Sequence, residues 1–577
     1  MNAPLSPTFD IPARGIAPYR RRWFDPTLIV FAILVLALGA LVVNPLARLV
    51  WESLRSADGG ITFANYLDAF GKARHLKALM TTLYIGLSST GLALAFGVPL
   101  AWAVSRTSLP GKKWIHGGVY ATFVMPPFLG AIAWILLASP NAGWLNKQWA
   151  GLFGNGNTPF NIYSFWGMSM LIALYAFPLV YLFTKSAFDL ISTEMEDAAA
   201  IHGASRPQVF RRVTLPLALP AIMGAAILVF LEAISLFGTP ALIGIPARIN
   251  VATTQMGMFF QYPLRTGTAA AYSMPVLAVT VILLLLQRRM LSRKGYISVS
   301  GKGGERRPLD IGPVKWLLSA YGTFVCCLSF VLPLAILLQA AFAKAWGKGL
   351  SWSNLTLNNF HYIFFEQKTV LHAMGNTVLY ALAAATACVL LGIVVAYVTQ
   401  RKLLPFPGLI HFMALAPFAV PGIILAVCFY AAYAGPPFSL YGSGWLIVIA
   451  YITRFMPIAA TTTTSGMRAL NPELEEAVRI LGGGRLLVLR RVVVPLLKNS
   501  LIGAFMLVFV IATRELSTAI FLTGPESRVM SVLTLDMSEQ GQYEILSAMG
   551  IVLVLMTTIV LGIGSRLAGR DFMIRRH

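Results

Sequence analysis

The stretch STEMEDAAAIHGASRPQVFRRVTLP at residues 192–216 returns at residues 471–495 as NPELEEAVRILGGGRLLVLRRVVVP. Gly203 pairs with Gly482 and Pro216 pairs with Pro495, and both pairs have the same offset in the numbering (482 − 203 = 495 − 216 = 279). A constant offset across a helix, a turn and a second helix indicates that the chain arose by duplication of one unit.

The composition shows what kind of unit was duplicated. Hydrophobic residues make up 57% of the 577 residues, charged residues make up 12%, and the mean hydropathy is +0.72. Soluble domains do not have this composition. Apolar stretches long enough to cross a bilayer recur, for example at 27–47, 81–105, 266–286 and 316–343. The sequence therefore predicts an all-α polytopic membrane protein with about twelve transmembrane helices.

The predicted spans divide into two tandem domains of six helices. Their centres lie near residues 37, 92, 127, 174, 231 and 278, and near 329, 385, 420, 455, 510 and 557. The predicted boundaries are an N-terminal tail (1–26), a first domain (27–290), a basic linker (291–315), a second domain (316–568) and a C-terminal tail (569–577).

A second alignment extends the duplication. Residues 81–106 match residues 376–401 at an offset of 295 (401 − 106), so the second half is shorter between the two landmarks by 295 − 279 = 16. We expect the additional chain in the loop at 142–163 of the first half. Equivalent segments keep the same sidedness, which is typical of a parallel transporter repeat with the translocation path between the halves.

The distribution of charge predicts the orientation in the membrane. Most of the 45 Lys and Arg residues fall in loops on one side if the N-terminus is cytosolic, and short cytosolic loops are enriched in these residues. Both termini are therefore expected in the cytosol. The first span is expected to be an uncleaved membrane anchor and not a secretory signal. The net charge of +23 reflects this topology and attraction to anionic lipid, so nucleic acid is not an expected partner.

The repeated segment has the signals of a capped helix and a tight turn. Ser192 and Asn471 suit the N-cap, acidic residues follow in the first turn, and Gly203 and Gly482 suit a left-handed C-cap. A second, basic helix precedes each proline. The result is a compact surface suited to docking a soluble partner; the alternative is an ordinary loop whose basic end lies at the lipid.

At these residues the sequence resembles the permease subunits of binding-protein-dependent ABC importers. Their signature is an EAA segment followed by a glycine and a Leu-Pro step. The matching residues are Asp197, Ala198, Ala199, Gly203, Leu215 and Pro216 in the first copy and Glu476, Ala477, Val478, Gly482, Val494 and Pro495 in the second. Aspartate replaces glutamate in the first copy, and valine replaces alanine and leucine in the second. These departures imply unequal contacts with the partners.

The resemblance implies two fused type I permease domains, each with a coupling helix seated in an ATPase subunit. It implies two copies of a cytosolic ATPase that carry ATP and Mg, an extracytoplasmic substrate-binding protein, and a location in the bacterial inner membrane. The sequence contains no GxxxxGK[ST] phosphate loop. The glycine-rich stretch at residues 301–304 lacks the spacing of that motif. No cofactor is expected in this chain, and the permease is not expected to be an enzyme.

The resemblance is greatest to the ferric-iron branch, through residues 237–240 and 514–517 and the fusion of two halves. Importers of thiamine, phosphonate, sulfate, molybdate or polyamine are the alternatives within the class. A secondary transporter driven by an ion gradient is the alternative outside it.

Four charges fall at predicted membrane depth, where each costs about 2.5–3.5 kcal/mol on insertion scales. They are Glu232, Arg454, Arg514 and Glu515. Arg454 is expected to pair with Glu515 across neighbouring helices. These residues are candidates for a gate or the pathway lining, or for an ion pair that fixes helix packing. The four cysteines and seven histidines have no metal-ligand spacing, so no metal site and no catalytic cluster are expected.

Overall fold

The computed structural model describes residues 26–56, 58–154, 158–293, 308–349, 351–404 and 406–567. Within these residues the chain is helical and no strand is formed; only isolated bridges occur. The all-α fold is confirmed. The two predicted tails and most of the predicted linker lie outside the described residues.

The first half contains thirteen α-helices among the described residues. They are α1 (Pro26–Leu38), α2 (Asn44–Leu54), α3 (Ala64–Phe70), α4 (Ala73–Arg106), α5 (Lys112–Val124), α6 (Pro127–Ala138), α7 (Trp144–Phe153), α8 (Phe165–Leu190), α9 (Thr193–Ile201), α10 (Arg206–Val209), α11 (Leu215–Ser235), α12 (Ala252–Phe259) and α13 (Thr266–Arg293).

The second half contains thirteen more in its described part. They are α14 (Val314–Cys326), α15 (Leu332–Ala341), α16 (Asn358–His361), α17 (Lys368–Gln400), α18 (Pro407–Leu415), α19 (Gly422–Tyr433), α20 (Gly444–Arg468), α21 (Glu473–Ile480), α22 (Arg485–Val488), α23 (Val494–Leu496), α24 (Lys498–Thr513), α25 (Met530–Glu539) and α26 (Tyr543–Leu567).

Short π and 3-10 segments interrupt or join these helices. They are η1 (Gly39–Val43), η2 (Phe210–Thr214), η3 (Pro240–Gly244), η4 (Cys327–Val331), η5 (Trp346–Lys348), η6 (Trp352–Asn354), η7 (Tyr362–Glu366), η8 (Ala416–Ala419) and η9 (Leu489–Val493). η2 and η9 correspond at the offset of 279, so the π-helical distortion belongs to the repeated unit.

Helices lie at or directly beside all twelve predicted span centres, but not all of the spans are straight. Nine helices in the described part of the chain are long and apolar enough to span a membrane, and three bent pairs raise the number to twelve. The pairs are Lys112–Val124 with Pro127–Ala138, bent by 102°; Pro407–Ala419 with Gly422–Tyr433, bent by 112°; and Arg485–Leu496 with Lys498–Thr513, bent by 75°.

The spans predicted near residues 127 and 420 are present as two of these bent pairs. Pro126 and Pro421 stand at the two sharpest breaks and correspond at the offset of 295, and a proline removes a backbone donor and clashes with the preceding turn. Each half thus carries the same broken third element.

Each half is organised around one long helix. α4 packs along α8, and α17 packs along α20. At both contacts a glycine permits close approach: a Cβ on Gly97 would lie 2.7 Å from Val180, and one on Gly392 would lie 3.0 Å from the backbone of Ala459. Small residues serve the same purpose in membrane helix pairs generally.

A hydrogen bond made by each long helix also recurs. Thr82 Oγ1 accepts from the backbone N–H of Ala252 at 2.7 Å, and Thr377 Oγ1 accepts from Met530 at 2.8 Å. Each bond fixes the start of a short helix, α12 or α25, against the long helix of its half. The repeat therefore extends to individual polar contacts.

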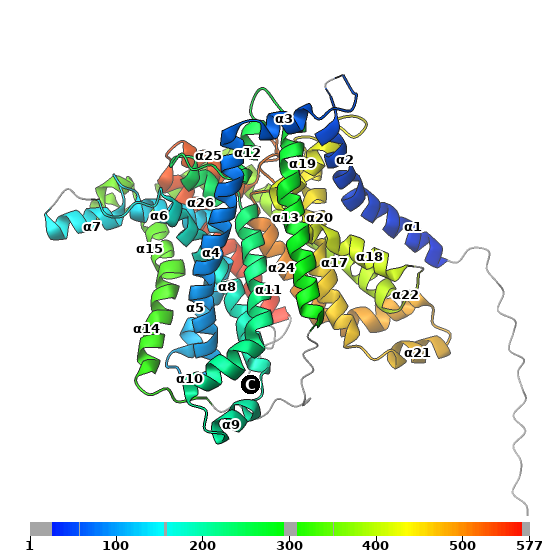
Figure 1. Ribbon diagram of the computed structural model, residues 1–577. Helices are drawn as coiled ribbons and strands as arrows, with labels where there is room; N and C mark the ends of the chain where they lie inside the picture. Colours follow the sequence, from blue (N-terminus) through cyan, green and yellow to red (C-terminus); the bar gives the residue numbers. More distant parts are fainter. Residues whose placement is uncertain are drawn as a thin grey trace, which may run out of the picture.

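The first span of each half packs against the other half. α2 contacts α19, and the carbonyl of Leu41 in η1 accepts from Thr453 Oγ1 at 3.2 Å. In the other direction α14 contacts α5, and Ser329 in η4 hydrogen-bonds Thr122 at 2.8 Å. Figure 1 shows the α1–α2 and α14–α15 helices on opposite sides of the bundle. This exchange joins the halves into one unit.

The additional chain of the first half lies where the sequence predicts it. The connection from α6 to α8 covers residues 139–164, whereas the corresponding connection from α19 to α20 covers only residues 434–443. The first connection is longer by 16 residues, which is the difference between the two offsets (295 − 279). The additional chain forms α7, which projects sideways from the bundle in Figure 1.

Candidate functional site: two matched helices and a charged layer

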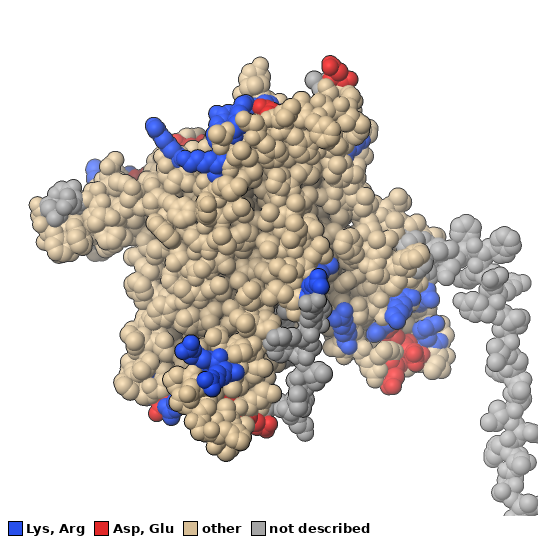
Figure 2. All heavy atoms as spheres, in the orientation of Figure 1, with Lys and Arg blue, Asp and Glu red and all other residues tan. Residues whose placement is uncertain are grey.

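The two repeated segments form exposed helical hairpins at one end of the bundle. α9 and α21 both lie at the lower end in Figure 1, far from α3, α12 and α25 at the upper end. Lys, Arg, Asp and Glu gather mainly at these two ends, and the band between them is almost free of charge on the face shown in Figure 2. This distribution fits a bilayer around the middle of the bundle.

Local hydrogen bonds explain where each hairpin helix begins. Ser192 Oγ accepts from the backbone N–H of Glu194 at 3.2 Å, and Asn471 Oδ1 accepts from Glu473 at 3.1 Å. Ser192 is the N-cap of α9 as predicted, whereas the N-cap of α21 is Pro472, one residue after the predicted Asn471.

Each helix ends at the predicted glycine. Gly203 has φ +84° and Gly482 has φ +83°, the left-handed region that glycine adopts without strain. The amide after each glycine closes the turn: Ala204 N–H donates to Ala199 O at 3.1 Å, and Gly483 N–H donates to Val478 O at 2.9 Å. These bonds form the C-terminal cap that the sequence predicts.

The predicted docking residues are mostly exposed. Asp197, Ala198, Gly203, Glu476, Ala477 and Gly482 are exposed, and Ala199 and its counterpart Val478 are half-buried. No atom lies within 4 Å of a Cβ placed on either glycine, so the space above both turns is open. The six exposed residues therefore give each hairpin an open surface.

The structure adds four apolar residues that sequence reasoning missed. Ile201 is 84% exposed and Ile480 is 85% exposed, and Met195 (44%) corresponds to Leu474 (48%). Both pairs correspond at the offset of 279, and this repetition was the sequence feature from which the exposed apolar residues could have been predicted. Matched apolar side chains left in solvent are typical of a surface that docks into a groove on another protein.

The membrane-depth charges meet where the two halves touch. Arg454 Nε lies 3.3 Å from Glu515 Oε2, so the predicted ion pair is present. The same carboxylate accepts from the backbone N–H of Thr518 at 2.9 Å. Arg514 reaches into the first half: it donates to the carbonyl of Phe123 and its guanidinium lies 4.9 Å from the centre of that ring.

These residues lie at breaks in the helices. Arg514 and Glu515 follow the end of α24 at Thr513 instead of lying within a helix, and Phe123 precedes the α5–α6 break. The backbone carbonyl of Glu515 is satisfied by Tyr451 Oη at 3.2 Å and Ser531 Oγ at 2.7 Å. Irregular backbone at membrane depth requires such partners.

Glu232, three residues from the end of α11, completes the charged layer. It interacts electrostatically with Arg514 and Arg454, and its side chain is accessible although protein surrounds it. The four predicted residues, two basic and two acidic, therefore lie close enough to interact in one layer.

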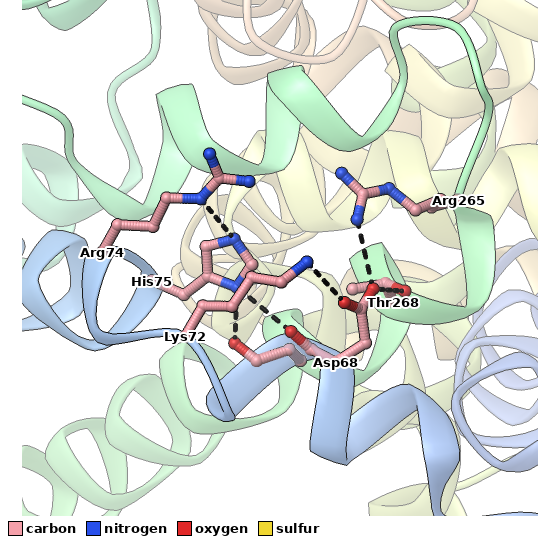
Figure 3. A network of polar contacts seen from close by, with 7 residues as sticks. Asp68, Lys72, Arg74, His75, Arg265 and Thr268 are labelled. Carbon is pink, nitrogen blue, oxygen red and sulfur yellow. Dashed lines mark hydrogen bonds and ion pairs between the residues drawn. The ribbon is translucent and has the colours of Figure 1, made fainter.

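A second polar network lies at the opposite end of the bundle, in the first half (Figure 3). Asp68 accepts from Lys72 at 3.0 Å and Thr268 at 3.0 Å, and it lies 3.3 Å from Arg265. Burial opposes ionisation of Asp68, but these donors and positive charges outweigh it and hold its pKa below the usual value. The carboxylate therefore stays charged at neutral pH.

An open polar pocket of about 310 Å³ adjoins this network. Its lining includes Glu52, Arg55, Asn65, Arg265 and Thr268. Asn65 donates to the carbonyl of Arg55 at 2.9 Å, which ties α3 to the end of α2. No group of three or more potential metal ligands occurs among the residues that the structure describes.

Taken together, a duplicated bundle of membrane helices with two exposed hairpins at one end defines a permease of the ABC importer class. The profile of the family "Binding-protein-dependent transport system inner membrane component" matches residues 93–295 and again 388–570. These ranges cover more than half of the chain, and the chain belongs to this family. It is a multi-pass inner-membrane protein with two fused permease domains, and a transporter subunit instead of an enzyme.

Among known proteins, the chain is similar to permeases named for ferric transport. It is 27% identical to the ferric transport system permease protein FbpB of Actinobacillus pleuropneumoniae, over 84% of this chain and 70% of that protein. It is 23% identical to the Fe(3+)-transport system permease protein FbpB 2 of Haemophilus influenzae, over 88% of this chain and 92% of that protein.

Some relatives match less than half of the chain. The trehalose transport system permease protein SugB of Mycobacterium tuberculosis is 31% identical over 42% of this chain and 83% of its own length. A bacterial ABC transporter that imports alginate has a solved structure with a TM-score of 0.36 and 16% identity, covering 44% of this chain and 96% of its own.

Proposed function

We propose that this chain is the permease of an importer for ferric iron and that α9 and α21 each dock one copy of a cytosolic ATPase subunit. The observation that carries the proposal is the matched surface of the two hairpins: open glycine turns, exposed acidic residues and exposed apolar residues at one offset of 279. Two matched surfaces can both be occupied only if the partner is present in two copies, one for each hairpin.

The docking residues in this proposal are Asp197, Ala198, Ala199 and Gly203 on the first hairpin and Glu476, Ala477 and Gly482 on the second. ATP and Mg bind to the ATPase subunits and not to this chain. The hairpin end of the bundle then faces the cytosol together with both termini. The ion-gradient alternative is set aside by membership of the family.

The opposite end of the bundle receives an extracytoplasmic substrate-binding protein. The family is named for its dependence on such proteins. The polar pocket beside Asp68 and Arg265 gives this end fixed charges with which a soluble protein can align.

In this proposal the layer formed by Glu232, Arg454, Arg514 and Glu515 lies on the path between the two ends. It joins the halves through Arg514 and Phe123, and it includes an accessible carboxylate. We propose that this layer is the gate of the pathway.

The iron assignment rests on the names of relatives that extend over both halves of the chain. The two ferric relatives match 84% and 88% of the chain and so extend over both halves, whereas a molybdenum permease of Escherichia coli, ModB, matches 36%. Importers of thiamine, phosphonate, sulfate or polyamine are the other members of the class to compare.

The test is ATP-dependent uptake in proteoliposomes that contain the chain, its ATPase subunit and its binding protein. We expect radiolabelled ferric iron to accumulate with ATP and Mg, and not with ATP omitted. Molybdate and thiamine are the matched cargo controls. Uptake of molybdate or thiamine but not iron would refute the cargo, and uptake that persists without the ATPase subunit would refute the coupling.

A further inference from the structure

An ion pair joins each hairpin helix to the long helix of its half. Arg106, the last residue of α4, places Nη2 3.7 Å from Glu196 Oε1. Arg401, immediately after α17, places Nη2 2.7 Å and Nε 2.8 Å from Glu475 Oε1. The arginines correspond at the offset of 295 and the glutamates at 279, so the contact brings together two segments of the repeat that have different offsets.

The same arginines also bind the connection between each hairpin helix and the membrane helix that precedes it. Arg106 Nη2 donates to the carbonyl of Ile191 at 2.7 Å, and Arg401 Nη2 donates to that of Leu470 at 3.5 Å. Ile191 and Leu470 again correspond at the offset of 279. One guanidinium therefore links three segments in each half: the long helix, the hairpin helix and the connection that precedes the hairpin helix.

These two glutamates differ from the other acidic residues of the hairpins. The Glu475 side chain is 10% exposed and that of Glu196 is 23% exposed, whereas Glu194, Asp197, Glu473 and Glu476 are exposed. A buried ion pair adds little net stability because desolvation offsets the attraction, but it fixes geometry. The inward glutamates therefore hold the helix in place while the outward acidic residues remain available to a partner.

We propose that Arg106 with Glu196 and Arg401 with Glu475 are positioning residues that fix α9 and α21 to α4 and α17. This inference rests on the proposed function, because it gives movement of a docked ATPase a direct route to the long helices. The side chain of Arg106 is 9% exposed and that of Arg401 is 17% exposed, so each acts through the hairpin helix.

The two attachments are unequal. Glu196 Oε1 also accepts from Thr214 Oγ1 at 2.6 Å, whereas Val493 occupies the corresponding position in the second half. α9 is therefore held by two side chains through Glu196, and α21 depends on Arg401. Loss of Arg401 should therefore increase the mobility of α21 more than loss of Arg106 increases that of α9.

The test compares Arg401→Gln with Arg106→Gln by hydrogen exchange in the full-length chain in lipid nanodiscs. Loss of a charge-assisted hydrogen bond should speed amide exchange in residues 473–483 about tenfold or more in Arg401→Gln. Arg106→Gln should speed exchange in residues 193–203 by less, because Thr214 still holds Glu196. Glu473→Gln and Glu194→Gln are matched controls on the exposed face, and they should leave exchange unchanged.

A charge exchange provides the second variant. Arg401→Glu combined with Glu475→Arg should slow exchange in residues 473–483 relative to Arg401→Gln, because the pair can form again. Equal exchange in Arg401→Gln and Glu473→Gln would overturn the proposal, and so would equal release of both hairpins.

A functional measurement separates this inference from the proposed function. Arg401→Gln should still bind the ATPase subunit, and stimulation of ATP hydrolysis by the binding protein should fall several-fold. A wild-type chain that binds no ATPase subunit would refute the proposed function, and the exchange data would still decide whether the ion pairs anchor the hairpins. Full stimulation in Arg401→Gln would refute the positioning role.

Discussion

The side chain of Arg454 lies so close to the backbone of Gly422 that a Cβ on this glycine would fall 1.6 Å from a guanidinium nitrogen. Gly422 is the first residue of α19, directly after the α18–α19 break. The break therefore leaves room for the arginine that pairs with Glu515. The lack of a side chain at Gly422 is therefore what allows the Arg454 guanidinium to occupy this position.

Removing either partner of the Arg454–Glu515 pair should destabilise the protein more than removing both. A single buried partner left alone costs about 3–5 kcal/mol, whereas loss of the whole pair costs less. Arg454→Ala, Glu515→Ala and the double variant should be compared by unfolding in detergent. Additive losses would contradict direct coupling.

Gly422→Ala should displace Arg454 and reproduce much of the Arg454→Ala defect. The added methyl group overlaps the guanidinium, and the side chain must leave Glu515. Gly408→Ala, in the neighbouring α18, is the matched control because no atom lies within 4 Å of its Cβ position. Equal stability of both variants would show that the close contact is not required.

The glycines of the hairpin turns make a different prediction. Gly203→Asp and Gly482→Asp place a side chain in open space at φ above +80°, which costs about 1–2 kcal/mol locally. The protein should therefore remain folded and lose transport, because the new side chain occupies the proposed docking surface. Uptake should be measured beside the unfolding temperature; unchanged uptake in both variants would contradict docking at these turns.

At the scale of helices, the network of Figure 3 fixes α3 against the start of α13. Asp68 lies on α3, whereas Arg265 and Thr268 lie at the N-terminal end of α13. The pKa of Asp68 is lowered by its donors despite partial burial. Its stabilising contribution is therefore present above the unfolded-state pKa and is lost as the pH falls through the lower folded-state pKa.

Asp68→Asn should lower the unfolding temperature by a constant amount between about pH 5 and pH 8, because Asp68 is fully ionised there in both states. The difference from the wild-type chain should shrink only below the ordinary carboxyl pKa, near 3.8. Glu366→Gln, an exposed residue whose partner is His361, is the control. A difference that changes between pH 8 and pH 5 would contradict this assignment.

The sequence predicted the helices better than their bends. Hydropathy located all twelve span positions because burial in lipid requires about twenty apolar residues whatever the path of the helix. The two sharpest bends depend on how Pro126 and Pro421 are accommodated by neighbouring helices, and a hydropathy average does not register that. The position of Arg514 beside Phe123 likewise depends on contacts between the two halves.

The candidate site was predicted where it repeats. Gly203 and Gly482 stand out because turn chemistry and a fixed offset coincide. Ile201 and Ile480 share that offset, but an isoleucine in an apolar chain has no distinguishing feature until its exposure is known. The arginine–glutamate anchors were missed because each pair joins segments that align at two different offsets.

For the molecule as a whole, duplication has produced two similar halves that exchange their first spans. α2 packs on α19, and α14 packs on α5, so each half contributes helices to the packing of the other. The hairpins are the parts that protrude from this joined bundle, at one end and in matched form. The molecule therefore presents two similar hairpins, attached unequally, on one end of a joined bundle.

The central claim is that the two hairpins each bind one ATPase subunit. Native mass spectrometry of the purified complex measures this directly, with the P-loop subunit identified by peptide sequencing. We predict one permease chain with two copies of the ATPase, reduced to one copy by Gly482→Asp. A wild-type complex with a single ATPase copy, or one that keeps both copies when both glycines are replaced, would contradict the account.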